Sequence, residues 1–290
     1  MSDLAEARIA VRKTYKLYIG GAFPRSESGR SYEVTDHKGG FAANAAMASR
    51  KDARDAVAAA RKAFGGWSAA TAYNRGQVLY RVAELLEGRR AQFTDEVAAA
   101  EGLKAARARD AVDAAIDRWV HYAGWTDKFA QVVGATDPVA GPYFTFSLPE
   151  PTGVVGVLAP QDSSLLGLVS VVAPVLATGN TAVVIASQDR PLPAVSLTEV
   201  LATSDVPGGV LNLLTGFTDE LAPWLAAHRD VNALDLTGAA PAARAGLRAA
   251  AAETVKRVHV PRATDWTAAP GVSRLRAFVE VKTVWHPIGV

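Results

Sequence analysis

The sequence predicts an α/β protein built around a doubly wound parallel sheet. From residue 153 onward, five short apolar runs (VVGVL, TAVVI, VLNLL, NALDL and KRVHV) alternate with four helical segments that begin near residues 163, 192, 219 and 240. Strands that alternate with helices indicate a parallel sheet, and runs rich in Val, Leu and Ile are typical of strands covered on both faces. Helical periodicity over residues 49–131 adds a set of helices ahead of the sheet.

The composition fits a globular protein and excludes several kinds of site. Hydrophobic residues make up 49% of the 290 residues, enough for a sizeable core. Lysine and arginine total 31 against 29 acidic residues, a balance that gives no reason to expect a nucleic-acid partner. The sequence has no cysteine, which excludes disulfides, thiolate metal ligands and a thiol nucleophile. The five histidines lie far apart, so no metal site is predicted.

The N-terminal residues predict no targeting segment. Residues 1–16 lack the apolar core of a secretory signal. The longest apolar run, over residues 165–177, is interrupted by Gly167, Ser170 and Pro174 and is too short to cross a bilayer. We therefore expect a cytoplasmic protein that has no membrane partner.

The first half of the chain predicts a hairpin followed by four helices. Residues 16–34 alternate in polarity around Gly20-Gly21, a pair suited to the positive φ of a hairpin turn. Ser49 and Asp52 have the spacing of a capping box at the start of a helix over residues 50–64. The remaining helices are predicted over residues 74–90, 91–102 and 104–131.

Two segments predict strands outside the parallel sheet. Residues 136–150 contain an aromatic alternation bounded by prolines. Residues 275–290 end on a long alternating strand that has no hairpin partner beside it in the sequence. Such a strand must add to the edge of a sheet, in this subunit or in another. Residues 261–274, which precede this tail, have the composition of a linker.

These segments together resemble the aldehyde dehydrogenase superfamily. The ordered matches include LYIGGAF, DARDAVAAARKAFGGWS, RWVHYAGWTDK, EPTGVVGVLAP, APVLATGNTAVV, VPGGVLNLLTG and EVKTVWHPIG. The resemblance implies a Rossmann-like NAD-binding domain over residues 1–135 and 151–260, and oligomerisation strands over residues 136–150 and 275–290. It also implies that residues 261–274 stand in place of the catalytic domain, which in the family lies between the last Rossmann strand and the C-terminal strand.

The positions that carry chemistry in the family differ in this sequence. The asparagine of the family's oxyanion hole corresponds to Asp162, whose carboxylate would repel a developing oxyanion. We therefore expect Asp162 or Ser163 only to cap the following helix. The lysine and glutamate that bind the adenosine ribose correspond to Ile185 and Gln188, and the phosphate-binding serine corresponds to Ala239.

No catalytic residue is predicted. The family's general base, a glutamate, corresponds to Pro261, and its nucleophilic cysteine has no counterpart. Oxidation of an aldehyde by hydride transfer requires a nucleophile that first adds to the carbonyl. His259 ends the last strand of the predicted sheet, and we interpret it as structural.

The resemblance leaves a set of vestigial cofactor-binding positions on the loops that follow the strands. These are Leu158, Ala159, Pro160, Ser187, Gly216, Thr237 and Gly238. Because the charged contacts of the family are lost, we expect no cofactor, or at most weak binding of NAD.

The leading hypothesis is a catalytically inactive subunit, a pseudoenzyme. It would dock on a full-length, active aldehyde dehydrogenase through residues 278–290 and stabilise or regulate that enzyme. The hypothesis depends on the loss of the catalytic parts while the association strand is retained. Two alternatives stay open: an NAD-dependent aldehyde dehydrogenase with an atypical site, and a nucleotide-binding sensor without turnover.

Overall fold

The central sheet is parallel and has the strand order β7-β6-β5-β8-β9 in a computed structural model that describes residues 13–261 and 264–289. The strands are β5 (Val154–Leu158), β6 (Thr181–Ile185), β7 (Leu211–Leu214), β8 (Ala233–Asp235) and β9 (Arg257–His259). The order reverses between β5 and β8, and in open sheets of this kind ligands bind beyond the carboxyl ends of the strands at that point. The predicted doubly wound parallel sheet is confirmed.

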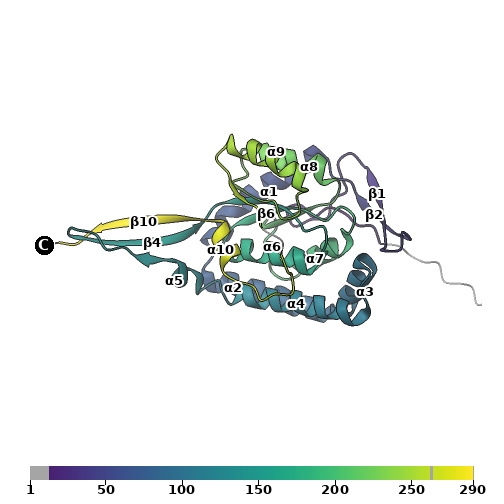
Figure 1. Ribbon diagram of the computed structural model, residues 1–290, viewed down its shortest axis with the longest axis horizontal. Coiled ribbons are helices and arrows are strands. Elements are labelled where there is room, and N and C mark those ends of the chain that lie inside the picture. Colours follow the sequence, from purple (N-terminus) through teal and green to yellow (C-terminus); the bar gives the residue numbers. More distant parts are fainter. Residues whose placement is uncertain (1–12, 262–263, 290) are drawn as a thin grey trace, which may run out of the picture.

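Helices cover both faces of this sheet (Figure 1). One face carries α6 (Leu166–Ala177) and α7 (Leu192–Ala202), and the other carries α1 (Arg50–Ala69), α8 (Thr218–Ala227) and α9 (Pro241–Ala252). A further layer lies over α6 and α7. It consists of α2 (Ala72–Gly88), α3 (Arg90–Glu101) and α4 (Ala105–Ala123).

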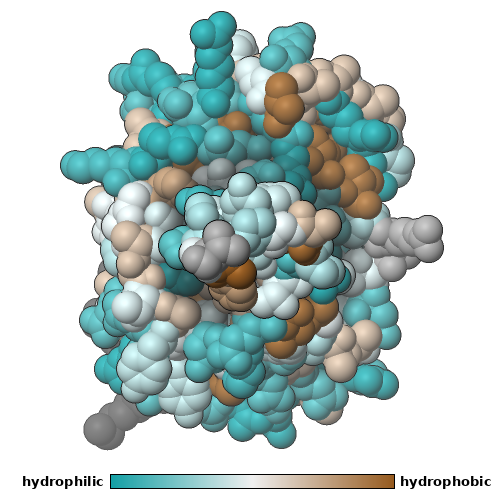
Figure 2. Space-filling view, turned by 90° about the vertical axis from the view of Figure 1, so that its left-hand side faces the viewer, coloured by the Kyte–Doolittle hydropathy of each residue, from teal (hydrophilic) through white to brown (hydrophobic). Residues whose placement is uncertain are grey.

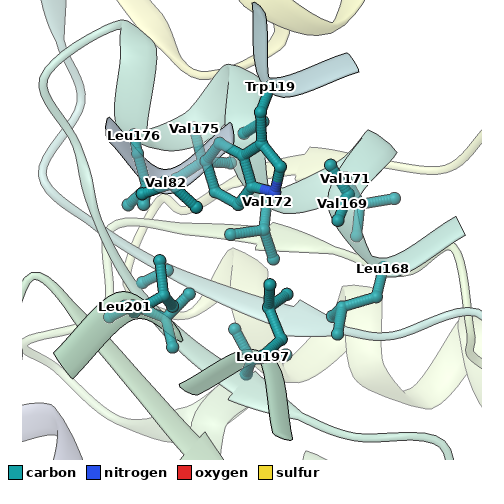
Figure 3. Packing of buried hydrophobic residues seen from close by; sticks show 14 of the residues in the cluster. Val82, Trp119, Leu168, Val169, Val171, Val172, Val175, Leu176, Leu197 and Leu201 are labelled. Carbon is teal, nitrogen blue, oxygen red and sulfur yellow. The ribbon is translucent and has the colours of Figure 1, made fainter. Parts of the chain in front are cut away.

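The larger part of the core lies under this further layer. Trp119 of α4 is fully buried and points toward Val172 and Val175 of α6, while Leu197 and Leu201 of α7 lie opposite (Figure 3). Because α6 contacts the sheet on one side and α2 and α4 on the other, all of its residues are buried. This explains why its sequence is apolar all round.

The local sequence signals of the N-terminal half are largely confirmed. Ser49 and Asp52 form the predicted capping box at the start of α1. Gly20 and Gly21 make a tight turn, with φ of +62° and +87°, that brings Ile19 and Ala22 into a β-bridge. The predicted strand after this turn, β1 (Ser31–Thr35), pairs instead with β2 (Phe41–Ala46).

The single helix predicted over residues 104–131 is divided in two. α4 ends at Ala123, and the chain turns before α5 (Phe129–Val133) begins. The hydroxyl of Thr126 donates to the carbonyl of Ala123 at 2.9 Å. Such a side-chain bond competes with continued helical hydrogen bonding.

The last strand, β10 (Val279–Pro287), pairs antiparallel with β4 (Tyr143–Pro151) along its whole length. The two strands project from the body of the protein (Figure 1), and we call them the arm. β3 (Ala135–Thr136) lies on the other side of β4, so β10 is an edge strand. The predicted terminal strand therefore adds to a sheet of its own chain and still has one open edge among the described residues.

No helix in the described part of the chain combines the length and the hydropathy needed to cross a bilayer.

Candidate functional site

The loops that follow β5, β6, β7 and β8 meet at the carboxyl edge of the sheet. They enclose a groove of about 480 Å³, which we call the carboxyl-edge groove. Its polar lining residues are Gln161, Asp162, Gln188, Asp189, Thr218, Asp219 and Thr237. Beyond Thr218 and Asp219 the groove continues into an apolar pocket of about 290 Å³ between α8 and α9. This is the position at which the sequence analysis expects vestigial cofactor-binding residues.

Three of those seven expected residues line this region. Thr237 and Gly238 line the groove, and Leu158 lines the pocket between α8 and α9. The other four are buried beside these walls without lining either space. They are Ala159, Pro160, Ser187 and Gly216. A role of any of the seven in binding a cofactor stays a prediction.

Hydrogen bonds within the chain already use many polar atoms of the groove. The amide of Gly238 donates to the carbonyl of Leu158 at 2.9 Å. Gln161 connects two loops, because its Nε2 donates to the carbonyl of Ala159 and its Oε1 accepts from the amide of Gln188. A Cβ at position 238 would lie 1.8 Å from the carbonyl oxygen of Ala159, so only glycine fits there. The loops therefore hold one another closely.

The N-terminal end of α6 also has its partner within the chain. Oε1 of Glu101, the last residue of α3, accepts hydrogen bonds of 2.6 Å from both the amide and the hydroxyl of Ser164. A helix N-terminus attracts anions, and here a carboxylate of the protein takes that position. Of the two predicted caps, Ser163 accepts from the amide of Gly167 at 2.9 Å. Asp162 instead accepts from Nε1 of Trp266, so of the two expected residues it is Ser163 that bonds to the start of α6.

The charges of the groove oppose a phosphate ligand. Asp162, Asp189 and Asp219 contribute three carboxylates to its lining, and none of its described lining residues is a lysine or arginine. The nearby guanidinium of Arg190 donates to the backbone carbonyl of Asp162. A pyrophosphate needs opposite charge or free donors. The residues present therefore do not fit the pyrophosphate of a dinucleotide, although the pocket between α8 and α9 has room for an apolar ring.

A buried ion pair lies next to the groove. Asp235, the last residue of β8, is fully buried, and its Oδ2 lies 3.0 Å from Nη1 of Arg274. Oδ1 of Asp235 accepts from both the amide and the hydroxyl of Thr237. These bonds occupy the amide and the hydroxyl of Thr237, a residue that the resemblance assigns to cofactor binding. The sequence analysis missed the pair; the available signal was a lone carboxylate inside the apolar run NALDL.

Arg274 belongs to the segment that joins β9 to β10. This segment, residues 260–278, includes α10 (Ser273–Ala277), and we call it the connector. His259 directly precedes it, and its ring lies 5.9 Å from the ring of Phe278 with an edge-on geometry. Burial lowers the pKa of His259, and the positive charge of Arg274 lowers it further against the opposing effect of Asp235. This placement agrees with the structural interpretation of His259.

Metal binding has no support in the described residues. Within residues 13–261 and 264–289, no three side chains of His, Asp or Glu come together as a possible metal site.

Comparison with known proteins identifies one family. The model of the aldehyde dehydrogenase family matches residues 23–261. Cytosolic 10-formyltetrahydrofolate dehydrogenase of Mus musculus is 32% identical over 268 residues, which are 88% of this chain and 29% of that protein. Mitochondrial benzaldehyde dehydrogenase of Antirrhinum majus is 34% identical over 251 residues, which are 84% of this chain and 46% of that protein.

A solved structure shows the same architecture. The crystal structure of an NAD-dependent aldehyde dehydrogenase from Sinorhizobium meliloti superimposes with a TM-score of 0.80 at 28% identity. The match covers 86% of this chain and 50% of that one. The chain thus spans about half the length, or less, of the relatives that it matches.

Proposed function

The chain belongs to the aldehyde dehydrogenase family, and on this premise we propose that it is a non-catalytic subunit that docks on a full-length aldehyde dehydrogenase through the arm. The observation that carries this proposal is an exposed two-stranded arm on a chain whose carboxyl-edge groove, at the opposite edge of the sheet, lacks the groups for catalysis. The proposal has two parts, which rest on different residues.

The first part is the absence of catalysis. The sequence contains no cysteine, and aldehyde oxidation by hydride transfer requires a nucleophile that adds to the carbonyl. In the groove, the hydroxyl of Thr237 donates to Asp235, whose other oxygen is ion-paired with Arg274. This hydroxyl is therefore engaged in the structure of the loop. Three carboxylates in the lining oppose both an oxyanion and a pyrophosphate.

The second part is docking through the arm. An isolated pair of strands is at best marginally stable in water, yet the arm exposes large apolar side chains. Val281 is 65% exposed and Trp285 is 58% exposed, and Tyr143, Phe144 and Leu148 of β4 are also exposed. Seen end-on in Figure 2, hydrophobic side chains gather at and beside the projecting strands. Exposed apolar patches of this kind mark interaction sites.

The open edge of β10 is the place where we expect the partner to bind. Its backbone groups have no partner strand on that side among the described residues. Such an edge can extend a sheet of another chain by strand addition. The match covers 86% of this chain but only 50% of the full-length relative, so the relative offers surfaces that a second copy of this chain does not. We therefore propose the full-length enzyme as the partner.

The structure refines the docking segment expected from the sequence. Phe278 is only 1% exposed and belongs to the core, so it cannot contribute its side chain to a partner. Val290 lies outside the described residues. The proposed contact therefore consists of residues 280–289 together with the exposed residues of β4.

Light scattering after gel filtration tests this proposal. The chain is measured alone and mixed with the full-length aldehyde dehydrogenase of the same organism, which should give a mixed complex of defined mass. Trp285→Ala should weaken the complex. Trp224→Ala, at a tryptophan of α8 that is 42% exposed, should not. A chain that stays a monomer beside the enzyme, or a complex indifferent to Trp285→Ala, would contradict the docking.

The absence of catalysis has its own assay. The purified chain is incubated with NAD and a panel of aldehydes, and NADH is followed by absorbance. We expect no NADH from the chain alone. Turnover above that of a matched blank would overturn the non-catalytic assignment and support the atypical enzyme instead.

A further inference from the structure

A second hollow lies between α4, α6 and the connector. Its volume is about 580 Å³, and it shares no lining residue with the carboxyl-edge groove. We call it the connector cavity. Its polar walls include Arg118 and Tyr122 of α4, Ser170 of α6, and Arg274 of the connector.

Arg118 is a buried cation without a carboxylate partner. It is 8% exposed, and none of the described residues forms a salt bridge with it. Its Nη2 donates to the carbonyls of Trp266 and Ala268 at 2.9 and 3.1 Å. Its Nε and Nη1 groups donate to no described residue, although a guanidinium has five N–H donors. Buried charges are normally paired, and these remaining N–H groups can donate to an anion that enters the cavity.

Tyr122 supplies a second donor beside Arg118. The two residues are four positions apart on α4 and therefore lie on the same face of the helix. Tyr122 is 1% exposed and lines the cavity, and its hydroxyl has no hydrogen-bond partner among the described residues. Arg118, Tyr122 and Arg274 line the same cavity. Burial raises the pKa of Tyr122, and the positive charges of Arg118 and Arg274 oppose that rise.

The remaining charges of the cavity leave Arg118 as the cation in need of a partner. Arg274 is already ion-paired with Asp235, and its guanidinium lies 5.6 Å from the centre of the Trp266 ring. Asp265 lies at the exposed rim, where its Oδ1 accepts from the amide and the hydroxyl of Thr267. Solvent screens the charge of Asp265 at this exposed rim, so Arg118 is the buried cation of the cavity that no described carboxylate pairs.

Part of the cavity lining is apolar. It comes from the indole of Trp266 and from Val260, Pro261, Ala268 and Pro270 of the connector. A ligand that satisfies both kinds of wall has one anionic head and an apolar body. An inorganic phosphate has no apolar body that could contact the apolar part of the lining.

We propose that the connector cavity binds a small organic carboxylate, whose oxygens accept hydrogen bonds from Arg118 and Tyr122 while its apolar part contacts Trp266 and the prolines of the connector. This site goes beyond the proposed docking function and depends on neither the arm nor the carboxyl-edge groove.

Isothermal titration calorimetry of the whole chain tests the proposal, with benzoate and butanoate as probes and inorganic phosphate for comparison. Both carboxylates should bind, and phosphate should bind more weakly or not at all. Tyr122→Phe should weaken the binding of benzoate about tenfold, because it removes one hydrogen bond to a charged group. Arg118→Gln should weaken it further, whereas Arg109→Gln, on the exposed part of the same helix, should leave it unchanged.

Hydrogen exchange provides a second readout. Benzoate should slow exchange in residues 264–278 of the wild type and should not do so in Tyr122→Phe. If Arg118→Gln does not fold, as judged by circular dichroism, Tyr122→Phe decides the matter, because it removes a single oxygen atom.

Three results would overturn the proposal. The first is the absence of carboxylate binding at millimolar concentration, and the second is carboxylate binding that both cavity variants leave unchanged. The third is binding of phosphate in preference to benzoate, because it would assign the cavity to a different class of anion.

Discussion

Replacing Arg274 by methionine should destabilise the protein, because it leaves the carboxylate of Asp235 buried without its counter-ion. The side chain of Asp235 is 0% exposed and that of Arg274 is 12% exposed, so water screens their interaction very little. Methionine retains the apolar length of the arginine stem. The substitution therefore removes mainly the charge and its hydrogen bonds.

The size of the effect follows from this burial. At an effective dielectric constant of about 20, opposite charges 3.0 Å apart attract each other by about 5–6 kcal/mol. Removing one partner of a buried pair costs about 3–5 kcal/mol in measured cases, because the remaining charge stays buried. We expect Arg274→Met to lower the free energy of unfolding by about 3 kcal/mol.

Urea denaturation followed by tryptophan fluorescence measures this change. The matched control is Arg81→Met, which breaks an ion pair with Glu84 whose side chains are about half exposed. That substitution should cost less than about 1 kcal/mol. Asp235→Asn combined with Arg274→Met should recover most of the loss, because the amide keeps an acceptor for Thr237 but carries no charge.

Two results would refute this reasoning. In one, Arg274→Met costs no more than Arg81→Met. In the other, the double variant is less stable than Arg274→Met alone. Either would mean that the pair adds little to the stability of the connector.

Two further predictions concern α4. Trp119→Ala should lower the free energy of unfolding by about 3–5 kcal/mol, because the indole is fully buried. The control Tyr73→Ala, at a side chain of α2 that is 70% exposed, should change it by less than about 0.5 kcal/mol. Similar urea midpoints for the two variants would contradict this prediction. Burial lowers the pKa of His121, and the charges of Arg118 and Lys128 lower it further. The unfolded ring therefore takes up a proton first, so stability should fall as the pH drops below about 6.5. Urea titrations at pH 7.5 and 5.5 should show a larger loss in the wild type than in His121→Gln, and equal losses would contradict this.

The sequence determines the sheet and its helices because the signals for them are local. Alternating apolar runs and helical segments predict the parallel sheet, and β5 to β9 follow that pattern. The Ser49–Asp52 capping box is also readable from spacing alone. The break after Ala123 was not predicted, because the turn there combines a cap at Gly124 with backbone and side-chain bonds to the carbonyl of Ala123, which leave the apolar periodicity unchanged.

The connector shows why the rest could not be predicted. Its composition is that of a linker, yet Arg118 binds two of its carbonyls and Asp235 binds its Arg274. Both contacts join residues far apart in the sequence, and neither produces a periodic pattern. The groove poses the same difficulty, because its carboxylates come from separate loops that only the folded sheet brings together.

The connector also fixes the base of the arm. Arg274 lies in α10, directly before Phe278 and β10. The carbonyl of Phe278 accepts a hydrogen bond of 2.8 Å from Nδ2 of Asn180, while Oδ1 of the same side chain accepts from the amide of Gly153. Asn180 thus ties the start of β10 to the chain just ahead of β5. Because these bonds are buried, β10 leaves the body in a direction set by the core. A docking surface presented in this way loses less conformational freedom on binding than a free tail would, which is consistent with a strand that serves association.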